Sequence, residues 1–281
     1  MICRINENNS FIYNVIIDKL KYYTLLLPWI FLLTSCEIEL PIEEDRIMVT
    51  NELQRSDTQQ DFIQKKLTQR CWLDYSANGY CLNYITYKED YNSSKNFRKR
   101  LRIPYEYQDG SYWGKLYLDL FDADKNKLAY LADTLAYIGE KYNLSRNQFA
   151  NMVVAFVQDI PYSYILVDEK CMDKNDGFDC VDGQRFGILT PIEFLHTLKG
   201  DCDTRTVLLY SIFKYFNFSP KIAISEEYAH SMLLLDVVTS GDYLTYNGKK
   251  YYFWETTAEG WKAGLMPPDF SNINNWEIAL Y

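Results

Sequence analysis

The chain of 281 residues contains only two histidines, His196 and His230. A metal site built from a cluster of histidine ligands is therefore excluded. Positive charge is also in deficit, because 29 Lys and Arg face 38 Asp and Glu, for a formal net charge of −9. Since an acidic surface repels a phosphate backbone, we expect no nucleic-acid partner.

Long hydrophobic runs, internal repeats and low-complexity segments are missing as well. Hydrophobic residues make up 48% of the chain and charged residues 24%, the proportions of an ordinary globular protein. A disordered chain and a protein with several membrane spans are thereby excluded. The apolar run at residues 22–35 holds 11 apolar residues, too few to span a bilayer comfortably but enough for the core of a signal peptide.

The apolar run ends in the residues Leu33-Thr34-Ser35-Cys36, and the acidic segment EIEL follows. This ending resembles a bacterial lipobox, in which small residues before a Cys allow cleavage and attachment of lipid to the thiol. We therefore expect a signal peptide at residues 1–35, lipid on Cys36, a tether at residues 36–55 and a place in the bacterial envelope, periplasmic or surface-exposed. The competing interpretation is a buried hydrophobic helix that ends in an ordinary Cys.

The seven cysteines support an exported protein. Cys3 would be removed with the signal peptide, and Cys36 would carry the lipid. The other five are two pairs that are close in sequence, Cys71/Cys81 and Cys171/Cys180, and the single Cys202. Two disulfides are expected, because an exported compartment permits them. A zinc site of four cysteines is the competing interpretation, but no Cys-x-x-Cys spacing is present.

Hydrophobic periodicity predicts an α+β fold with helices first and an antiparallel sheet after them. A polar helix is expected at 57–69, a hairpin at 71–87 and a loop at 91–113, whose basic residues 98–102 form a solvated face. Further helices are predicted around 128–138, after a Ser145 cap, after Thr190-Pro191 and after Asp201. The predicted strands are KIAIS, HSMLLLDVV and a hairpin around Asn247-Gly248, the strongest hairpin signal in the chain.

Cys202 is the candidate nucleophile. If Asp201 caps the helix, Cys202 lies in its first turn, where the helix dipole favours a thiolate. The flanking carboxylates oppose this effect, so a neighbouring imidazolium is needed for a low thiol pKa. His230, at the start of an apolar strand, can supply it, whereas His196 lies in an apolar helix and is expected to be a packed residue. Glu255 shares a strand face with large apolar residues, so we expect it to orient His230.

Four segments in this order resemble the transglutaminase-like superfamily: VQDIPY at 157–162, GDCDTRT at 200–206, YAHS at 228–231 and WETT at 254–257. The resemblance covers residues 145–262. It implies a papain-like core in which the nucleophile helix packs on an antiparallel sheet, with Cys202 as nucleophile, His230 as base and Glu255 as acid. Glu255 stands where the family usually has Asp, and Asp236 is a weaker candidate for that role.

The resemblance implies acyl transfer through a thioester, with a peptide or protein as substrate. We expect no metal or cofactor, because the acidic segment DKNDGFD at 173–179 reads as a polar turn rather than as a calcium-binding loop. The oxyanion would be stabilised by the backbone N–H of Cys202 and by a second donor, Gln158 or Lys199. The alternative is an inactive transglutaminase-like module that binds a partner in the envelope. The predicted domains are an α/β extension at residues 56–120 and the catalytic domain at residues 121–281.

Overall fold

The computed structural model describes residues 64–107, 111–173, 177, 179–237 and 240–281. The chain divides into two units, Met1–Glu39 and Leu40–Tyr281, and all the described residues belong to the second. The predicted signal peptide, the lipidation site Cys36 and the tether lie outside the described residues. Among the described helices, none has the length and apolar character needed to cross a membrane.

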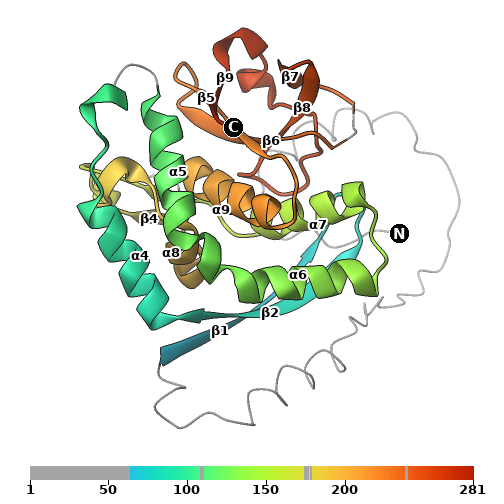
Figure 1. Ribbon diagram of the computed structural model, residues 1–281, viewed down its shortest axis with the longest axis horizontal. Helices are drawn as coiled ribbons and strands as arrows, with labels where there is room; N and C mark the ends of the chain where they lie inside the picture. The colour runs from blue at the N-terminus through green and yellow to red at the C-terminus, as the bar shows by residue number, and fades with distance from the viewer. Residues whose placement is uncertain (1–63, 108–110, 174–176, 178, 238–239) are drawn as a thin grey trace, which may run out of the picture. The chain divides into compact units, whose positions relative to one another are not determined.

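The described part of the chain is a mixed α+β unit, as predicted (Figure 1). Its six α-helices are α4 (Lys88–Arg100), α5 (Tyr112–Asp124), α6 (Ala129–Lys141), α7 (Arg146–Gln158), α8 (Pro191–Thr197) and α9 (Cys202–Tyr215). The strands are β1 (Lys65–Leu73), β2 (Gly79–Tyr87), β3 (Ser163–Ile165), β4 (Asp179–Val181), β5 (Lys221–Ser225), β6 (His230–Leu235), β7 (Tyr243–Tyr246), β8 (Lys249–Trp254) and β9 (Glu277–Leu280).

Three sheets form from these strands. The largest has the order β7-β8-β6-β5-β9 and is antiparallel throughout, whereas β1-β2 is an antiparallel hairpin and β3-β4 a short parallel pair. The hairpins predicted around 71–87 and Asn247-Gly248 are both present. Residues 65–69, which were expected to continue a polar helix, belong instead to β1.

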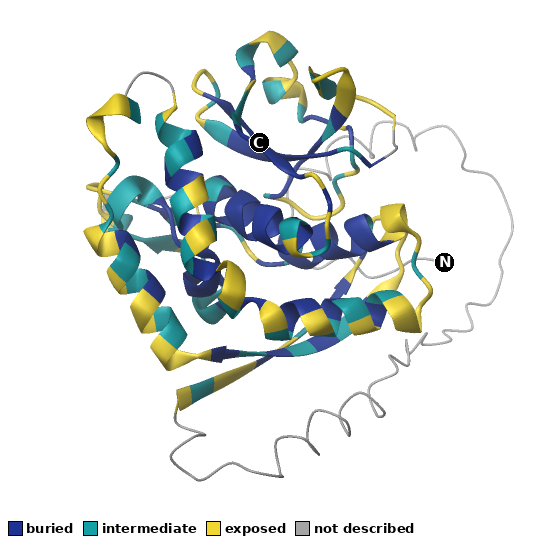
Figure 2. Ribbon diagram, in the orientation of Figure 1, coloured by how far each residue is buried: buried dark blue, intermediate teal, exposed yellow. Residues whose placement is uncertain are grey.

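Helix α9 is the centre of the unit. It packs on β5 and β6 and on α5, α7 and α8, and its residues from Thr204 to Phe213 are all buried. Figure 2 shows this as an almost continuous dark blue helix, in contrast to the banded colours of α4 and α6. A helix that is buried on every side needs no amphipathic stripe, and the apolar run in its sequence reflects that position.

The five-stranded sheet lies between two apolar layers. Successive side chains of each strand point to opposite faces, so each strand contributes to both layers. In β6, Leu233 and Leu235 join the core shared with α7 and α9. Met232 and Leu234 point to the opposite face, which is covered by the C-terminal segment around Trp276. The alternation places Ser231 on the α9 side of the sheet and His230 on the other side, at the end of the strand.

Helix α4 and the N-terminal part of α5 correct the prediction of a loop at residues 91–113. The buried positions of α4 are Ser94 and Arg98, both polar, so hydrophobic periodicity could not reveal the helix. Arg98 is not on a solvated face: it is fully buried, and its guanidinium binds both carboxylate oxygens of Glu193, at 2.6 and 2.8 Å. A bidentate pair of this kind satisfies both buried charges.

The predicted disulfides Cys71–Cys81 and Cys171–Cys180 are both formed, and Cys202 is the free cysteine among the described residues. Cys71 lies directly opposite Cys81 in the β1-β2 hairpin. Two disulfides indicate an oxidising compartment outside the cytoplasm. The zinc interpretation is wrong, because the four cysteines are paired with each other.

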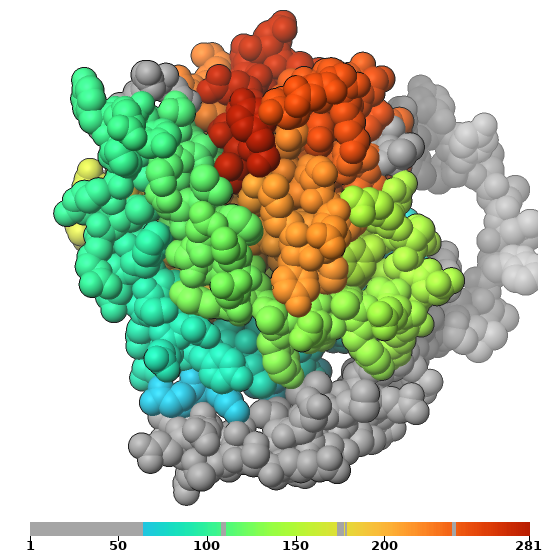
Figure 3. Space-filling model, viewed as in Figure 1, coloured from blue at the N-terminus to red at the C-terminus, as the bar shows by residue number. Residues whose placement is uncertain are grey.

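Segments far apart in the sequence meet where α5 packs against β9. A Cβ at Gly114 would come within 2.0 Å of the Ala279 carbonyl oxygen, so only glycine allows this approach. On the face shown in Figure 3, the green of α5 therefore adjoins the dark red of the C-terminal strand. The predicted boundary at residue 120 falls within α5.

Candidate active site

The turn before α9 presents Cys202 as the first residue of the helix. Asp201 caps the helix, accepting a hydrogen bond from the Thr204 N–H at 3.1 Å. Gly200 is required here, because a Cβ would lie 2.9 Å from both the Phe194 ring and the Thr204 methyl group. Cys202 is 7% exposed, so its thiol lies almost entirely below the surface.

His230 and Glu255 form a buried hydrogen-bonded pair, as expected from their strands. Nε2 of His230 lies 3.0 Å from Oε2 of Glu255, and the two side chains are 8% and 1% exposed. The second carboxylate oxygen, Oε1, accepts hydrogen bonds from the Thr256 N–H at 2.7 Å and from the N–H and hydroxyl of Thr257 at 2.8 and 2.7 Å. Both oxygens of the carboxylate are thereby held.

These contacts keep Glu255 ionised. Burial alone would raise the pKa of Glu255, but the hydrogen bond and charge of His230 and the hydrogen bonds from Thr257 lower the pKa below its ordinary value. A carboxylate at Nε2 fixes the proton of the neutral imidazole on that nitrogen. Nδ1 of His230 then carries the lone pair and is the nitrogen able to accept a proton.

The start of β6 lies against the first turn of α9. Hydrogen bonding from the backbone and hydroxyl of Ser231, which follows His230, offsets part of the rise in the pKa of the Cys202 thiol, so Ser231 lies beside Cys202. Burial raises the pKa of Asp203, the residue after Cys202, and hydrogen bonds from Tyr117 and Ser231 and the charge of His230 offset part of that rise. Within the described chain, however, no hydrogen bond joins the Cys202 thiol to the His230 ring, which packs on Phe270 with 4.9 Å between ring centroids.

The resting thiol differs from the prediction of a low pKa. Burial, followed by the charges of Asp203 and Asp201, raises the pKa of Cys202 well above its ordinary value. Exclusion of water and the two acidic neighbours outweigh the helix dipole. Burial and the Asp203 carboxyl also raise the pKa of Asp201, to about 8. The resting site therefore holds a protonated Cys202 rather than a thiolate.

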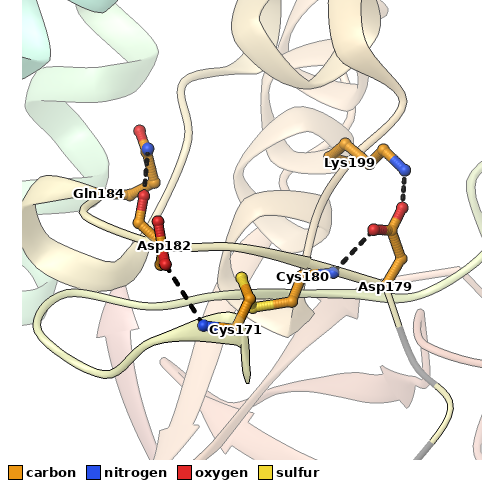
Figure 4. The surroundings of a disulfide bond; sticks show 6 residues. All are labelled: Cys171, Asp179, Cys180, Asp182, Gln184 and Lys199. Carbon is orange, nitrogen blue, oxygen red and sulfur yellow. Dashed lines mark hydrogen bonds and ion pairs between the residues drawn. A yellow bond between two sulfur atoms is a disulfide. The ribbon is translucent and has the colours of Figure 1, made fainter. Parts of the chain in front are cut away.

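Neither predicted oxyanion donor is free to act. The side-chain amide of Gln158 donates to the backbone carbonyls of Glu255 and Trp261, at 2.7 and 3.2 Å. Lys199 turns away into the disulfide loop, where its ammonium pairs with Asp179 beside the Cys171–Cys180 bond (Figure 4). Gln158 therefore positions the Glu255 backbone, while Lys199 fastens the loop.

The remaining candidates lie elsewhere. Asp236 pairs with Lys249 and lies 3.9 Å from Arg146, so it does not orient His230. His196 is a packed helix residue, as expected, with its Nδ1 2.8 Å from the Thr86 hydroxyl oxygen. Across the described residues, no group of three or more His, Cys, Asp or Glu side chains could hold a metal ion.

Sequence reasoning missed Arg205, one turn after Cys202. Its side chain is fully buried and donates to four backbone carbonyls at 2.5–3.2 Å: Val157, Ile160, Gly200 and Thr256. One cation thus ties together the end of α7, the turn before Cys202 and the segment that follows Glu255. The available signal was an arginine as the one charged residue in the helix sequence TRTVLLY, because a buried arginine needs several acceptors.

The structure thus gathers Cys202, the His230–Glu255 pair and the end of α7 at one end of the five-stranded sheet. This arrangement can supply a thiol, a base with a free ring nitrogen and a carboxylate that orients the base. No family model matches the chain, and neither a curated protein nor a solved structure matches it.

Proposed function

We propose that the protein is a cysteine hydrolase or acyltransferase of the transglutaminase-like type, acting on peptide or amide bonds with Cys202, His230 and Glu255. The observation that carries the proposal is the 3.0 Å hydrogen bond between His230 and a buried, ionised Glu255, placed one residue from the Ser231–Cys202 contact. A buried carboxylate that accepts from an imidazole beside a helix-terminal thiol has the roles of a catalytic triad.

The raised pKa of Cys202 determines the order of proton transfers. His230 acts as a general base rather than as the partner of a preformed thiolate: Nδ1 takes the thiol proton as sulfur attacks the substrate carbonyl. Glu255 stabilises the resulting imidazolium. The C–S bond forms while the carbonyl electron pair moves to oxygen, and the tetrahedral intermediate then expels an amine that receives the proton from His230. Water or a second amine resolves the thioester.

The thiol and the imidazole must approach one another for the first step. Catalytic hydrogen bonds are often long or misaligned before substrate binds and tighten in the complex. We propose that the His230 ring, which packs on Phe270, rotates so that Nδ1 approaches Cys202 while Nε2 keeps its hydrogen bond to Glu255. Substrate binding is proposed to drive this rotation.

We further propose that the protein is held at the bacterial envelope by lipid on Cys36. The two disulfides support an oxidising compartment. The Leu33–Cys36 sequence supports lipidation. Intact-mass analysis of the membrane fraction tests this anchor: a chain that begins at Cys36 with added lipid supports it, and a chain that retains Met1 contradicts it.

The catalytic proposal is tested by labelling the exported protein with a peptide-based electrophile directed at cysteine nucleophiles. We expect labelling at Cys202, abolished in Cys202→Ala and strongly slowed in His230→Ala. The disulfide cysteines should remain unlabelled. If wild-type protein, folded and with both disulfides intact, is not labelled at Cys202, the enzyme proposal is wrong.

The second candidate function is an inactive envelope module that uses the same surface to bind a partner. The deep burial of Cys202 and its missing hydrogen bond to His230 favour this candidate. It predicts that Cys202 reacts as an ordinary buried thiol, at a rate that His230→Ala does not change.

A further inference from the structure

Acyl transfer at Cys202 requires a second donor for the oxyanion besides the backbone N–H of Cys202. The amide of Gln158 and the ammonium of Lys199 are both engaged with other partners. A different polar group must therefore face the Cys202 N–H, and the segment between α7 and β3 provides one.

Tyr162 lies in this segment, next to the nucleophile turn. The backbone N–H of the following residue, Ser163, donates to the Gly200 carbonyl at 3.2 Å, which fixes the segment alongside the turn. The Tyr162 hydroxyl forms a hydrogen bond with the backbone of Cys202, at the N–H that an oxyanion would use. Tyr162 is half-buried, whereas Cys202 is buried.

Arg205 holds the Tyr162 ring in this place. The guanidinium carbon lies 5.6 Å from the ring centroid, within range of a cation–π contact. The same guanidinium donates to the carbonyls of Ile160 and Gly200, at 2.5 and 3.1 Å. Because these bonds fix the backbone on both sides of the contact, the hydroxyl is delivered to the first turn of α9 by rigid surroundings.

We propose that the Tyr162 hydroxyl is the second oxyanion donor, an inference that rests on the proposed acyl transfer at Cys202. In the resting site the phenol oxygen accepts a hydrogen bond from the Cys202 N–H. When a substrate carbonyl enters, its oxygen takes over this N–H, and the phenol turns its own proton toward the same oxygen. As the C–S bond forms, the carbonyl electron pair moves to an oxygen that then accepts two hydrogen bonds. The phenol keeps its proton throughout.

The surroundings keep Tyr162 in the donor form. Burial, followed by the charges of Cys202 and Asp201, raises the pKa of Tyr162 far above its ordinary value. The hydroxyl therefore stays protonated at neutral pH, where it can donate a hydrogen bond.

The test compares two reactions of the same thiol in Tyr162→Phe. Acylation by p-nitrophenyl acetate passes through a tetrahedral oxyanion, whereas alkylation by iodoacetamide does not. We expect acylation of Cys202 to slow by about 10²–10³, the effect of removing one oxyanion donor. Alkylation should change by less than about threefold, because the phenyl ring still fills the same space. Tyr164→Phe is the matched control, since its ring packs edge-on against that of Tyr162, and we expect both of its rates to match the wild type.

The possible results distinguish the proposed function from the proposed oxyanion role of Tyr162. If the wild type acylates no faster than Cys202→Ala, the proposed function fails. If the wild type acylates through Cys202 and Tyr162→Phe does so equally fast, the function stands and the oxyanion role is wrong. Equal slowing of acylation and alkylation would also overturn the role, because it would show that Tyr162 acts on the thiol rather than on the oxyanion.

Discussion

The surroundings of the two histidines differ in the charge of the groups that contact each ring. Nδ1 of His196 shares one hydrogen bond with the neutral Thr86 hydroxyl. The His196 ring stacks on the Tyr91 ring, with 4.5 Å between ring centroids. Burial, then the charges of Lys66 and Lys88, lower its pKa. His230 instead faces an ionised Glu255. Cations beside the His196 ring disfavour its protonation, whereas the carboxylate at Nε2 of His230 orients that ring, and only the second arrangement suits catalysis.

The difference between the two histidines is tested most strongly by replacing each of them with alanine. We expect His230→Ala to slow acylation of Cys202 by about 10²–10⁴, the usual contribution of a general base. His196→Ala should leave the rate within about threefold, since its ring contacts neither Cys202 nor Glu255. Stopped-flow release of p-nitrophenol measures both. A larger loss in His196→Ala would reverse the assignment of the base.

Glu255→Gln tests what the carboxylate adds to His230. The amide can still hydrogen-bond to Nε2, but it supplies no charge for the imidazolium and can accept the wrong tautomer. We expect a loss of about tenfold or more in acylation, smaller than that of His230→Ala. Glu255→Asp keeps the charge and should retain more activity than Glu255→Gln. Equal rates in the two variants would show that charge is not the property that matters.

The pH profile of Cys202 alkylation follows from the resting thiol. Because burial and the flanking aspartates raise the thiol pKa, the rate should rise with a midpoint above the ordinary thiol value of about 8.5. Asp201→Asn keeps a good helix cap and removes one of the opposing carboxyls, so it should shift the midpoint downward. A wild-type midpoint below about 8.5 would indicate a preformed thiolate–imidazolium pair instead.

The smallest expected effect concerns stability near His196. Its folded-state pKa is lowered, so the unfolded chain binds more protons as the pH falls through about 6.5, and the free energy of unfolding decreases on acidification. His196→Gln should remove this component and flatten the decline of Tm between pH 7 and pH 5 by ~2 °C. An unchanged slope would show that the pKa of His196 is the same in the folded and unfolded states.

The elements around the site could be predicted because their signals are local. Asp201 and Ser145 cap α9 and α7 as expected, and strand alternation places Glu255 on the face of His230. Helix α4 escaped prediction because its buried side chains, Ser94 and Arg98, are polar and are satisfied by groups distant in sequence. Burial of such side chains depends on partners that no local pattern reveals.

The polar contacts of the site could not be predicted from the sequence for the same reason. Gln158 was a reasonable donor by its position, but its amide is used up by two backbone carbonyls. Tyr162 lies beside Cys202 because long-range hydrogen bonds fix its segment to Gly200 and Arg205. The high pKa of Cys202 likewise reflects the depth of its burial, which residue spacing does not encode.

The central claim, that Glu255 acts through His230 on Cys202, is tested most directly by a double-mutant cycle. The rate of acetyl transfer from p-nitrophenyl acetate to Cys202, followed by intact mass, is measured in wild type, His230→Ala, Glu255→Gln and the double variant. If the carboxylate works only through the imidazole, the double variant acylates as slowly as His230→Ala and no slower. Losses that multiply would contradict the account, because they would show that the two residues act independently.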